Sequence, residues 1–178
     1  MNEKRKVVLY IAESLDGFIA KEDNDISWLS IVEKPNEDYG YNDFVNTIDT
    51  VIMGRKTYEK VLSFGIEFPH KDKKSYVLSR TLEGTNENVE FYNGTINDLI
   101  KKLKSEDGKN IFIDGGAEVV REFRNENLID EYIISIIPVL LGKGIRLFKD
   151  ANMENKLKLI ESKVFDSGLV QLKYERLE

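Results

Sequence analysis

The sequence contains no cysteine and only one histidine, His70. A chain without thiols forms no disulfide and has no thiolate nucleophile, and its composition suits a reducing compartment such as the cytoplasm. A single histidine leaves too few nitrogen and sulfur ligands for the usual zinc sites, so no metal site is predicted. His70 stands between Pro69 and Lys71, a setting that predicts an exposed loop residue without a functional role.

Long hydrophobic runs are also missing. The first apolar run, Val7 to Ala12, is too short for a signal peptide or a membrane span. No stretch has the composition of a flexible linker, so residues 1–178 are predicted to form one soluble, cytoplasmic domain. The 26 lysines and arginines are outnumbered by 32 acidic residues. A surface of that sign repels phosphates, so no nucleic-acid or membrane partner is expected.

Short β-prone runs alternate with segments of helical periodicity along most of the chain. Thr95 with Asp98 resembles a capping box, and the apolar residues that follow are spaced as on one face of a helix. In the last third, Leu157 to Phe165 and Leu169 to Leu177 flank a turn and predict an antiparallel hairpin. This order predicts an α/β fold, a three-layer αβα sandwich with a mixed, mostly parallel sheet of about eight strands.

Two glycine-containing turns follow predicted strands and precede predicted helices. The first, Gly54-Arg55-Lys56-Thr57, brings helix N–H groups, a hydroxyl and two cationic side chains together, which suits an anion such as a pyrophosphate. The second, Gly115-Gly116-Ala117, lets a ligand approach the backbone closely because glycine has no Cβ. An ordinary strand turn with solvated charges is the alternative interpretation of each motif.

Three segments resemble dihydrofolate reductase in their order and spacing, namely Val51 to Glu59, Tyr76 to Arg80 and Ile111 to Ala117. Two others, Ser14 to Ala20 and Ile137 to Gly144, are more similar to the reductase domain of bifunctional riboflavin-synthesis enzymes. The chain thus resembles the riboflavin-reductase-like branch of the dihydrofolate reductase superfamily. The resemblance implies a dihydrofolate-reductase-like fold and implies the substrate less directly.

The resemblance also implies a site for NADPH. Arg55 and Arg80 would compensate the charge of a 2′-phosphate, which favours NADPH over NADH. Glu118 departs from the basic or neutral residue expected at its position. The residues implied to contact the nicotinamide, the pyrophosphate, the adenosine side and the second turn are Ala12, Ile19, Gly54, Arg55, Lys56, Thr57, Ser79, Arg80, Gly115, Gly116, Ala117 and Glu118.

Three residues are implied on the substrate side. Asp38 has the spacing of the carboxylate that holds a pteridine ring and promotes its protonation, and Trp28 matches a tryptophan ahead of it. A buried carboxylate there could serve in catalysis; the alternative is a solvated loop acid. Asp114 is a second candidate substrate contact, or else a cap of the following helix.

The leading hypothesis is therefore an NADPH-dependent reductase of a C=N or C=O group in a nitrogen heterocycle. In pattern it is nearest to the reductase of 5-amino-6-(5-phosphoribosylamino)uracil in riboflavin synthesis. Dihydrofolate reductase is the second hypothesis, and a non-catalytic module that binds or senses a nucleotide is the third. The apolar strand Ile133 to Ile137 and its hairpin neighbours predict a homodimer interface.

Overall fold

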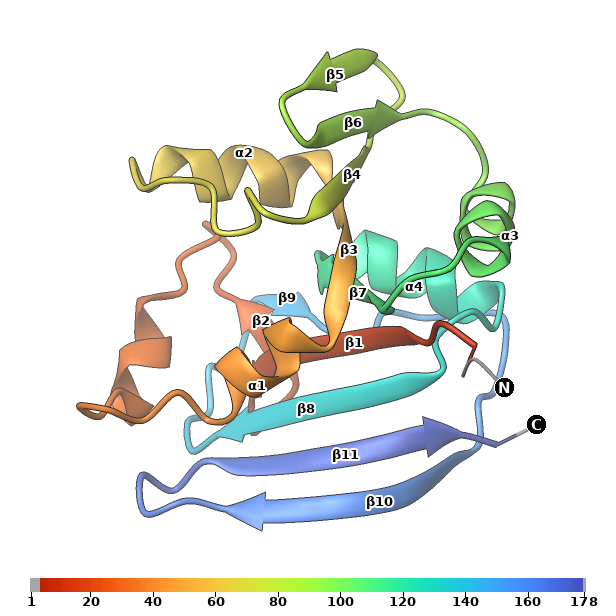
Figure 1. The fold of residues 1–178 in the computed structure, drawn as a ribbon. Helices are drawn as coiled ribbons and strands as arrows, with labels where there is room; N and C mark the ends of the chain where they lie inside the picture. Colours follow the sequence, from red (N-terminus) through yellow and green to blue (C-terminus); the bar gives the residue numbers. More distant parts are fainter. Residues whose placement is uncertain (1–3, 178) are drawn as a thin grey trace.

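The computed structural model describes residues 4–177, which form a nine-stranded sheet with helices on both faces (Figure 1). In order across the sheet, the strands are β10 (Leu157–Val164), β11 (Val170–Arg176), β8 (Glu131–Ile137), β1 (Val7–Ser14), β7 (Asn110–Gly115), β3 (Ile48–Gly54), β4 (Lys74–Leu78), β6 (Val89–Tyr92) and β5 (Gly84–Asn86).

The sheet is mixed and mostly parallel, as predicted. Strands β8, β1, β7, β3, β4 and β6 run parallel to one another, whereas β11, β10 and β5 each pair antiparallel with the strand beside them. The count exceeds the expected eight because the short strand β5 pairs with β6 at the edge of the sheet. Two short strands, β2 (Phe18–Ala20) and β9 (Ile145–Arg146), pair in a separate antiparallel sheet.

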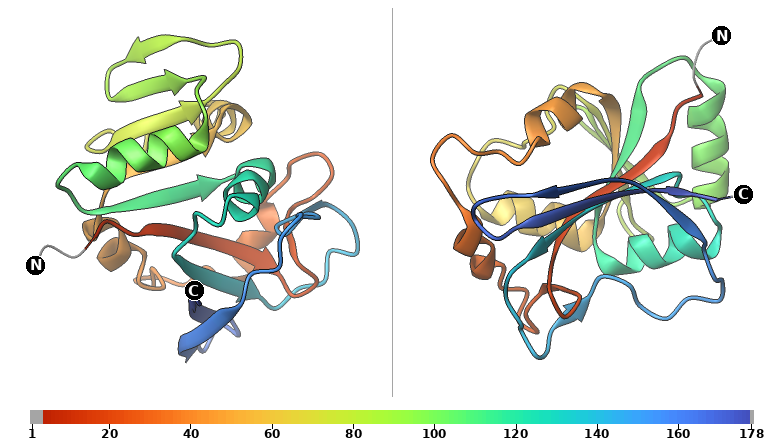
Figure 2. Two further views of the ribbon diagram at one scale, coloured as in Figure 1. Left: turned by 90° about the vertical axis from the view of Figure 1, so that its right-hand side faces the viewer. Right: turned by 90° about the horizontal axis from the view of Figure 1, so that it is seen from below.

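Two helices cover each face of the sheet, as the right-hand view of Figure 2 shows. Helices α3 (Ile96–Ser105) and α4 (Ala117–Asn125) pack on one face, over the aliphatic side chains of β1, β7 and β8. Helices α1 (Tyr41–Asn46) and α2 (Arg55–Ser63) pack on the other, against β3, β4 and an aromatic group. A short 3-10 helix, η1 (Ser27–Val32), precedes α1. The predicted three layers are confirmed.

Local sequence signals set the ends of several elements. Thr95 caps α3, because its hydroxyl accepts a hydrogen bond from the Asp98 backbone N–H at 3.1 Å. Strand β8 ends at Ile137, one residue before Pro138, which has no N–H to continue the ladder. Within residues 4–177, no helix is both long and apolar enough to cross a membrane.

Strand β8 is an interior strand of the sheet. It lies between β1 and β11, so the backbone of Ile133 to Ile137 is already paired on both sides. An isolated sequence shows that such a run is apolar but not whether its edges are occupied. The edge strand at this end of the sheet is β10, whose eight residues are all exposed.

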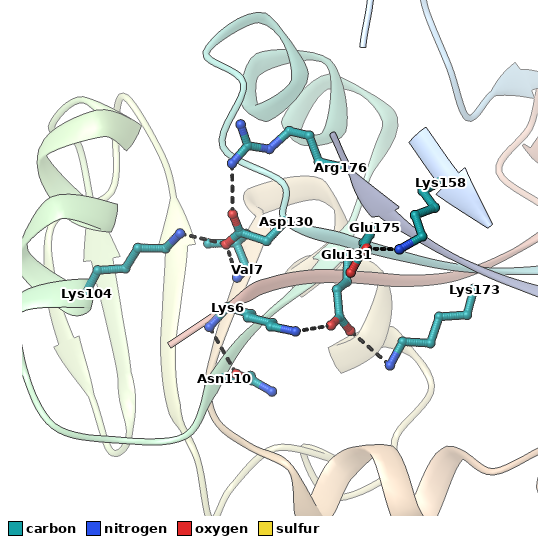
Figure 3. Close-up of polar contacts among 10 residues, drawn as sticks. All are labelled: Lys6, Val7, Lys104, Asn110, Asp130, Glu131, Lys158, Lys173, Glu175 and Arg176. Atoms are coloured by element: carbon teal, nitrogen blue, oxygen red, sulfur yellow. Dashed lines mark hydrogen bonds and ion pairs between the residues drawn. The ribbon is translucent and has the colours of Figure 1, made fainter. Parts of the chain in front are cut away.

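A charged network holds the amino ends of β1 and β8 (Figure 3). Glu131 at the start of β8 pairs with Lys6 at 2.6 Å and with Lys173 of β11 at 3.1 Å. Asp130 accepts from Lys104 of α3 at 2.6 Å and pairs with Arg176 at 3.1 Å. These contacts tie four elements together at the edge opposite the candidate site.

Candidate active site at the carboxyl edge of the sheet

The candidate site lies at the carboxyl edge, where β1, β7, β3 and β4 end side by side. Gly54 is in register with Leu78, and Met53 is in register with Gly115. The turns after β3, β4 and β7 are therefore neighbours in space although they are far apart in sequence. Open α/β sheets bind ligands at such an edge.

Two helices begin at this edge without side-chain caps. Gly54 is the N-cap residue of α2 and Gly116 that of α4, and neither helix start has a side-chain cap hydrogen bond. The first N–H groups of both helices are thus available to an anion, which the positive ends of the helix dipoles also favour. The peptide bond between Gly115 and Gly116 is cis.

The glycines allow the two turns to approach each other. A Cβ on Gly54 would lie 3.1 Å from Cγ2 of Val119 in α4, and one on Gly116 would lie 3.3 Å from Oγ1 of Thr57 in α2. These separations are tighter than ordinary contacts, so larger residues would push the two helix starts apart. The two adjacent turns, 54–57 and 115–117, are called the cradle below. Their helix N–H groups suit a dinucleotide pyrophosphate.

Cationic and hydroxyl groups lie on the turns after β3 and β4, beside this cradle. Arg55 donates to Oγ1 of Thr81 at 2.9 Å, which joins the turn after β3 to the turn after β4. Oγ of Ser79 accepts from the N–H groups of Thr81 at 3.2 Å and Leu82 at 2.9 Å and so shapes the second turn. Arg80 is exposed on that turn. The two arginines predicted to meet a 2′-phosphate are thus on adjacent turns.

Glu118 is neutralised by its neighbours. Its carboxylate pairs with Lys149 at 2.5 Å and with Arg121 at 2.8 Å. The hydrogen bond from Lys149, and then the nearby charges of Lys149, Arg121 and Lys56, hold the pKa of Glu118 below its usual value. An acid in the first turn of α4 therefore does not leave an uncompensated negative charge beside the cradle.

The two residues expected at the nicotinamide occupy different apolar clusters. Ala12 of β1 packs with the group around Trp28, whereas Ile19 of β2 packs against the core beneath α3 and α4. Both are partly exposed.

His70 corrects another expectation, because it is buried rather than exposed. Only 2% of the residue is accessible, and its Nε2 atom lies 3.3 Å from Oδ2 of Asp114, the residue directly before the two glycines. The loop after α2 folds back under the sheet edge, a long-range event that the polar sequence around His70 does not reveal. Asp114 remains one-quarter exposed at its side chain.

Two tyrosines that sequence reasoning missed extend this polar group. The rings of Tyr10 and Tyr41 meet edge-to-face at 5.5 Å. Burial, followed by the charge of Asp114, raises the pKa of Tyr41. The Tyr10 hydroxyl accepts from Gln171 of β11 at 3.1 Å. Tyr10, the one tyrosine in the otherwise aliphatic run Val7 to Ala12, is the sequence signal that could have indicated these polar groups.

Asp38 is not the buried carboxylate that the catalytic prediction required. It is exposed, and its two oxygens accept the N–H groups of Gly40 at 2.9 Å and Asn42 at 3.1 Å at the start of α1. These backbone hydrogen bonds, that from Gly40 first, lower the pKa of Asp38. The sequence spacing could not show that the loop turns this side chain outward.

Trp28 is buried as part of η1, against Val32, Ile137 and Leu169. Its indole Nε1 has no hydrogen-bond partner among the described residues. Tyr39 of the same cluster accepts at its carbonyl from Tyr10 at 3.2 Å. Trp28 thus shares a cluster with Tyr39, whose carbonyl contacts the Tyr10 hydroxyl.

Comparisons with known proteins agree with this geometry. The family model of the RibD C-terminal domain matches residues 5–171. Uncharacterized protein YwjB of Bacillus subtilis (strain 168) is 49% identical over 174 residues, 97% of this chain and 99% of that protein. A crystal structure from Shewanella sp. PV-4, whose name assigns the protein to riboflavin biosynthesis, is 33% identical with a TM-score of 0.90, covering 97% of this chain and 99% of that one.

A more distant structure supports the fold alone. Dihydrofolate reductase from Enterococcus faecalis, in complex with NADP(H), has a TM-score of 0.67 and 18% identity over 97% of both chains. The chain belongs to the RibD C-terminal domain family and has the dihydrofolate-reductase-like fold.

Proposed function

We propose that the protein is an NADPH-dependent reductase of a C=N or C=O group in a nitrogen heterocycle. The observation that carries this proposal is the convergence of two uncapped helix starts, α2 and α4, at one glycine-lined cradle. Arg55, Lys56 and Thr57 on one side and Gly116 and Ala117 on the other would hold the cofactor. When bound, NADPH would supply the hydride.

The substrate would lie on the α1 side of β7, beside Asp114 and Tyr41. Family membership points first to 5-amino-6-(5-phosphoribosylamino)uracil or a related aminopyrimidine. A partly exposed carboxylate next to a half-buried tyrosine suits a ring that carries N–H groups or a protonated nitrogen, because both offer donors to the carboxylate.

The cofactor proposal predicts that Arg55→Ala weakens NADPH binding by about 10–100-fold, because a hydrogen bond to a charged group contributes roughly 1.5–3 kcal/mol. NADH, which has no 2′-phosphate, should bind equally to both forms. Calorimetric titration with each nucleotide measures this. Lys60→Ala, a charge removal in the last turn of the same helix, is the control and should change neither affinity. Equal weakening for both nucleotides would place Arg55 elsewhere on the cofactor.

Dihydrofolate is the second candidate substrate, favoured by the buried Trp28, whose indole Nε1 has no hydrogen-bond partner within residues 4–177. NADPH-dependent loss of dihydrofolate absorbance would support it, and a flat trace would remove it. A non-catalytic nucleotide-binding module is the third candidate. Tight NADPH binding without turnover of a broad heterocycle panel would favour that function.

We also propose a homodimer that forms through the exposed edge of β10, the outer strand of the hairpin that pairs with β8. Leu159 is 51% exposed and Val164 is 80% exposed on this strand, and monomeric proteins usually protect such edges. Antiparallel pairing of two β10 strands would satisfy their free backbone groups about a two-fold axis.

The dimer is tested by light scattering. The wild-type protein should have twice the chain mass, and the Leu159→Lys variant should have the single-chain mass. A wild-type monomer at micromolar concentration contradicts the proposal.

A further inference from the structure

The imidazole of His70 lies directly behind the Asp114 carboxylate at the start of the second glycine turn. The His70 side chain is 3% exposed, whereas that of Asp114 is 25% exposed. The rings of Phe68 and Phe112 pack edge-on against the imidazole, at centroid distances of 5.7 and 5.8 Å. The aromatic rings hold the imidazole in the orientation that places Nε2 against the carboxylate.

The surroundings decide which imidazole nitrogen carries the proton. Among the described residues, Nδ1 of His70 is buried without a partner, whereas Nε2 faces Oδ2 of Asp114 at 3.3 Å. An ionised carboxylate can only accept, and a buried N–H without an acceptor would lose its hydration with no compensation. The tautomer protonated at Nε2 is therefore favoured, and Nε2–H donates to Oδ2.

We propose that His70 is a positioning residue that fixes one oxygen of Asp114, so that the other oxygen, Oδ1, delivers a proton to the substrate. This inference rests on the proposed reductase function and assigns its proton source. No described group forms a hydrogen bond with Oδ1, and the exposure of Asp114 allows contact with both substrate and solvent. The fully enclosed imidazole cannot reach the substrate and acts only through the carboxylate.

In this reduction a bound nicotinamide would be the hydride donor and Asp114 the proton donor. The hydride forms a new C–H bond at the C=N carbon, and the π electron pair moves to nitrogen. The O–H bond of protonated Asp114 breaks as the proton forms an N–H bond, which leaves a carboxylate. Nε2–H of His70 stabilises that carboxylate through a charge-assisted hydrogen bond, and solvent returns the proton to the exposed oxygen.

Other charged or titratable groups surround the pair. Tyr41 of α1 lies near Asp114, and Tyr10 of β1 lies against Tyr41. Asp72, in the loop that carries His70, interacts electrostatically with the imidazole. The phenol groups of Tyr41 and Tyr10 have raised pKa values, and Asp114 is the carboxylate whose Oδ2 lies 3.3 Å from Nε2 of the imidazole.

The first test is spectroscopic and needs no substrate. Because the chain has one histidine, a long-range ¹H–¹⁵N spectrum of labelled protein contains one imidazole. The proposal predicts a proton on Nε2 and a bare Nδ1, and a shifted Nε2 signal in Asp114→Ala. Saturating NADPH should shift the same signals in the wild type. A proton on Nδ1, or an imidazole that is indifferent to both Asp114→Ala and NADPH, overturns the proposal.

The second test separates positioning from packing. NADPH oxidation is followed with 5-amino-6-(5-phosphoribosylamino)uracil and with dihydrofolate. His70→Leu should lower kcat by about 10–100-fold, the effect of one hydrogen bond to a charged group, with NADPH affinity unchanged. His70→Gln, which keeps an N–H donor at similar reach, should restore most of kcat. Lys71→Ala, an exposed change in the same loop, is the matched control. A Gln variant as slow as the Leu variant overturns the positioning role.

The two hypotheses fail in different ways. If calorimetry shows no NADPH binding, the reductase function fails and the proton role fails with it, while the imidazole spectrum still reports the His70–Asp114 bond. If NADPH binds and the Nε2 proton is absent, the reductase function stands and the role of His70 is overturned. If neither compound is reduced, an NADPH-induced shift of the imidazole signals still places the His70–Asp114 pair beside the bound cofactor. The absence of that shift places the pair away from the cofactor.

Discussion

Replacing Arg5 with alanine is expected to lower the free energy of unfolding by about 3 kcal/mol, because it breaks a buried hydrogen-bonded ion pair. Arg5 is 6% exposed. Its guanidinium donates to the carbonyl of Lys109 at 2.7 Å, that of Leu103 at 3.0 Å, Oγ1 of Thr50 at 2.7 Å and the carboxylate of Asp49. One side chain thus joins β1, β3, the end of α3 and the segment before β7.

This loss of unfolding free energy lies at the low end of the range for buried pairs, because the Asp49 side chain is 39% exposed and can regain water. Urea denaturation followed by circular dichroism measures the change. Lys158→Ala removes a cation from an exposed pair with Glu175 and should leave the unfolding midpoint unchanged. A midpoint for Arg5→Ala within error of the control would show that the network contributes little.

Replacing Gly144 with alanine is expected to destabilise the protein by roughly 3 kcal/mol, the sum of backbone strain and a steric overlap. Gly144 has φ +152°, where side chains other than hydrogen are strained, and a Cβ there would lie 2.2 Å from the Ala20 carbonyl oxygen. Because that atom belongs to the backbone, β9 would have to move away from β2. The pairing of Ala20 with Ile145 should be lost.

A second glycine in the same turn provides the control. Gly142 also has a positive φ, +74°, but nothing lies within 4 Å of an added Cβ. Gly142→Ala should therefore cost about 1 kcal/mol from backbone strain alone. Thermal and urea unfolding of both variants, with amide exchange of residues 18–20, measures the difference. Equal losses for the two variants would mean that the backbone near Gly144 relaxes freely.

Much of the fold could be predicted because strand and helix signals are local. The capping box at Thr95, the proline after Ile137 and the terminal hairpin each act within a few residues, and the structure has the corresponding helix start, strand end and strand pair. The weak strands were missed. Both β5 and the β2–β9 pair are short, and their pairing partners rather than their own sequences make them strands.

In the candidate site, too, the features with a local sequence signature were predicted and those that depend on distant contacts were not. The Gly54 and Gly115 turns were recognisable because a glycine-containing strand-to-helix turn has a local signature. His70, by contrast, is buried 44 positions before its partner Asp114, and nothing in the sequence around it indicates a carboxylate neighbour. Asp38 was misplaced because its orientation depends on how the loop after β2 enters α1.

The sequence by itself determined the family, the strand-turn-helix order and the two glycine turns, because these depend on side-chain pattern and on backbone freedom at particular positions. Only the tertiary structure decided that β8 is interior, that Asp38 faces solvent and that His70 lies behind Asp114. Those outcomes depend on which segments are brought together when the core is buried, and contacts of that range leave no mark on the neighbouring residues.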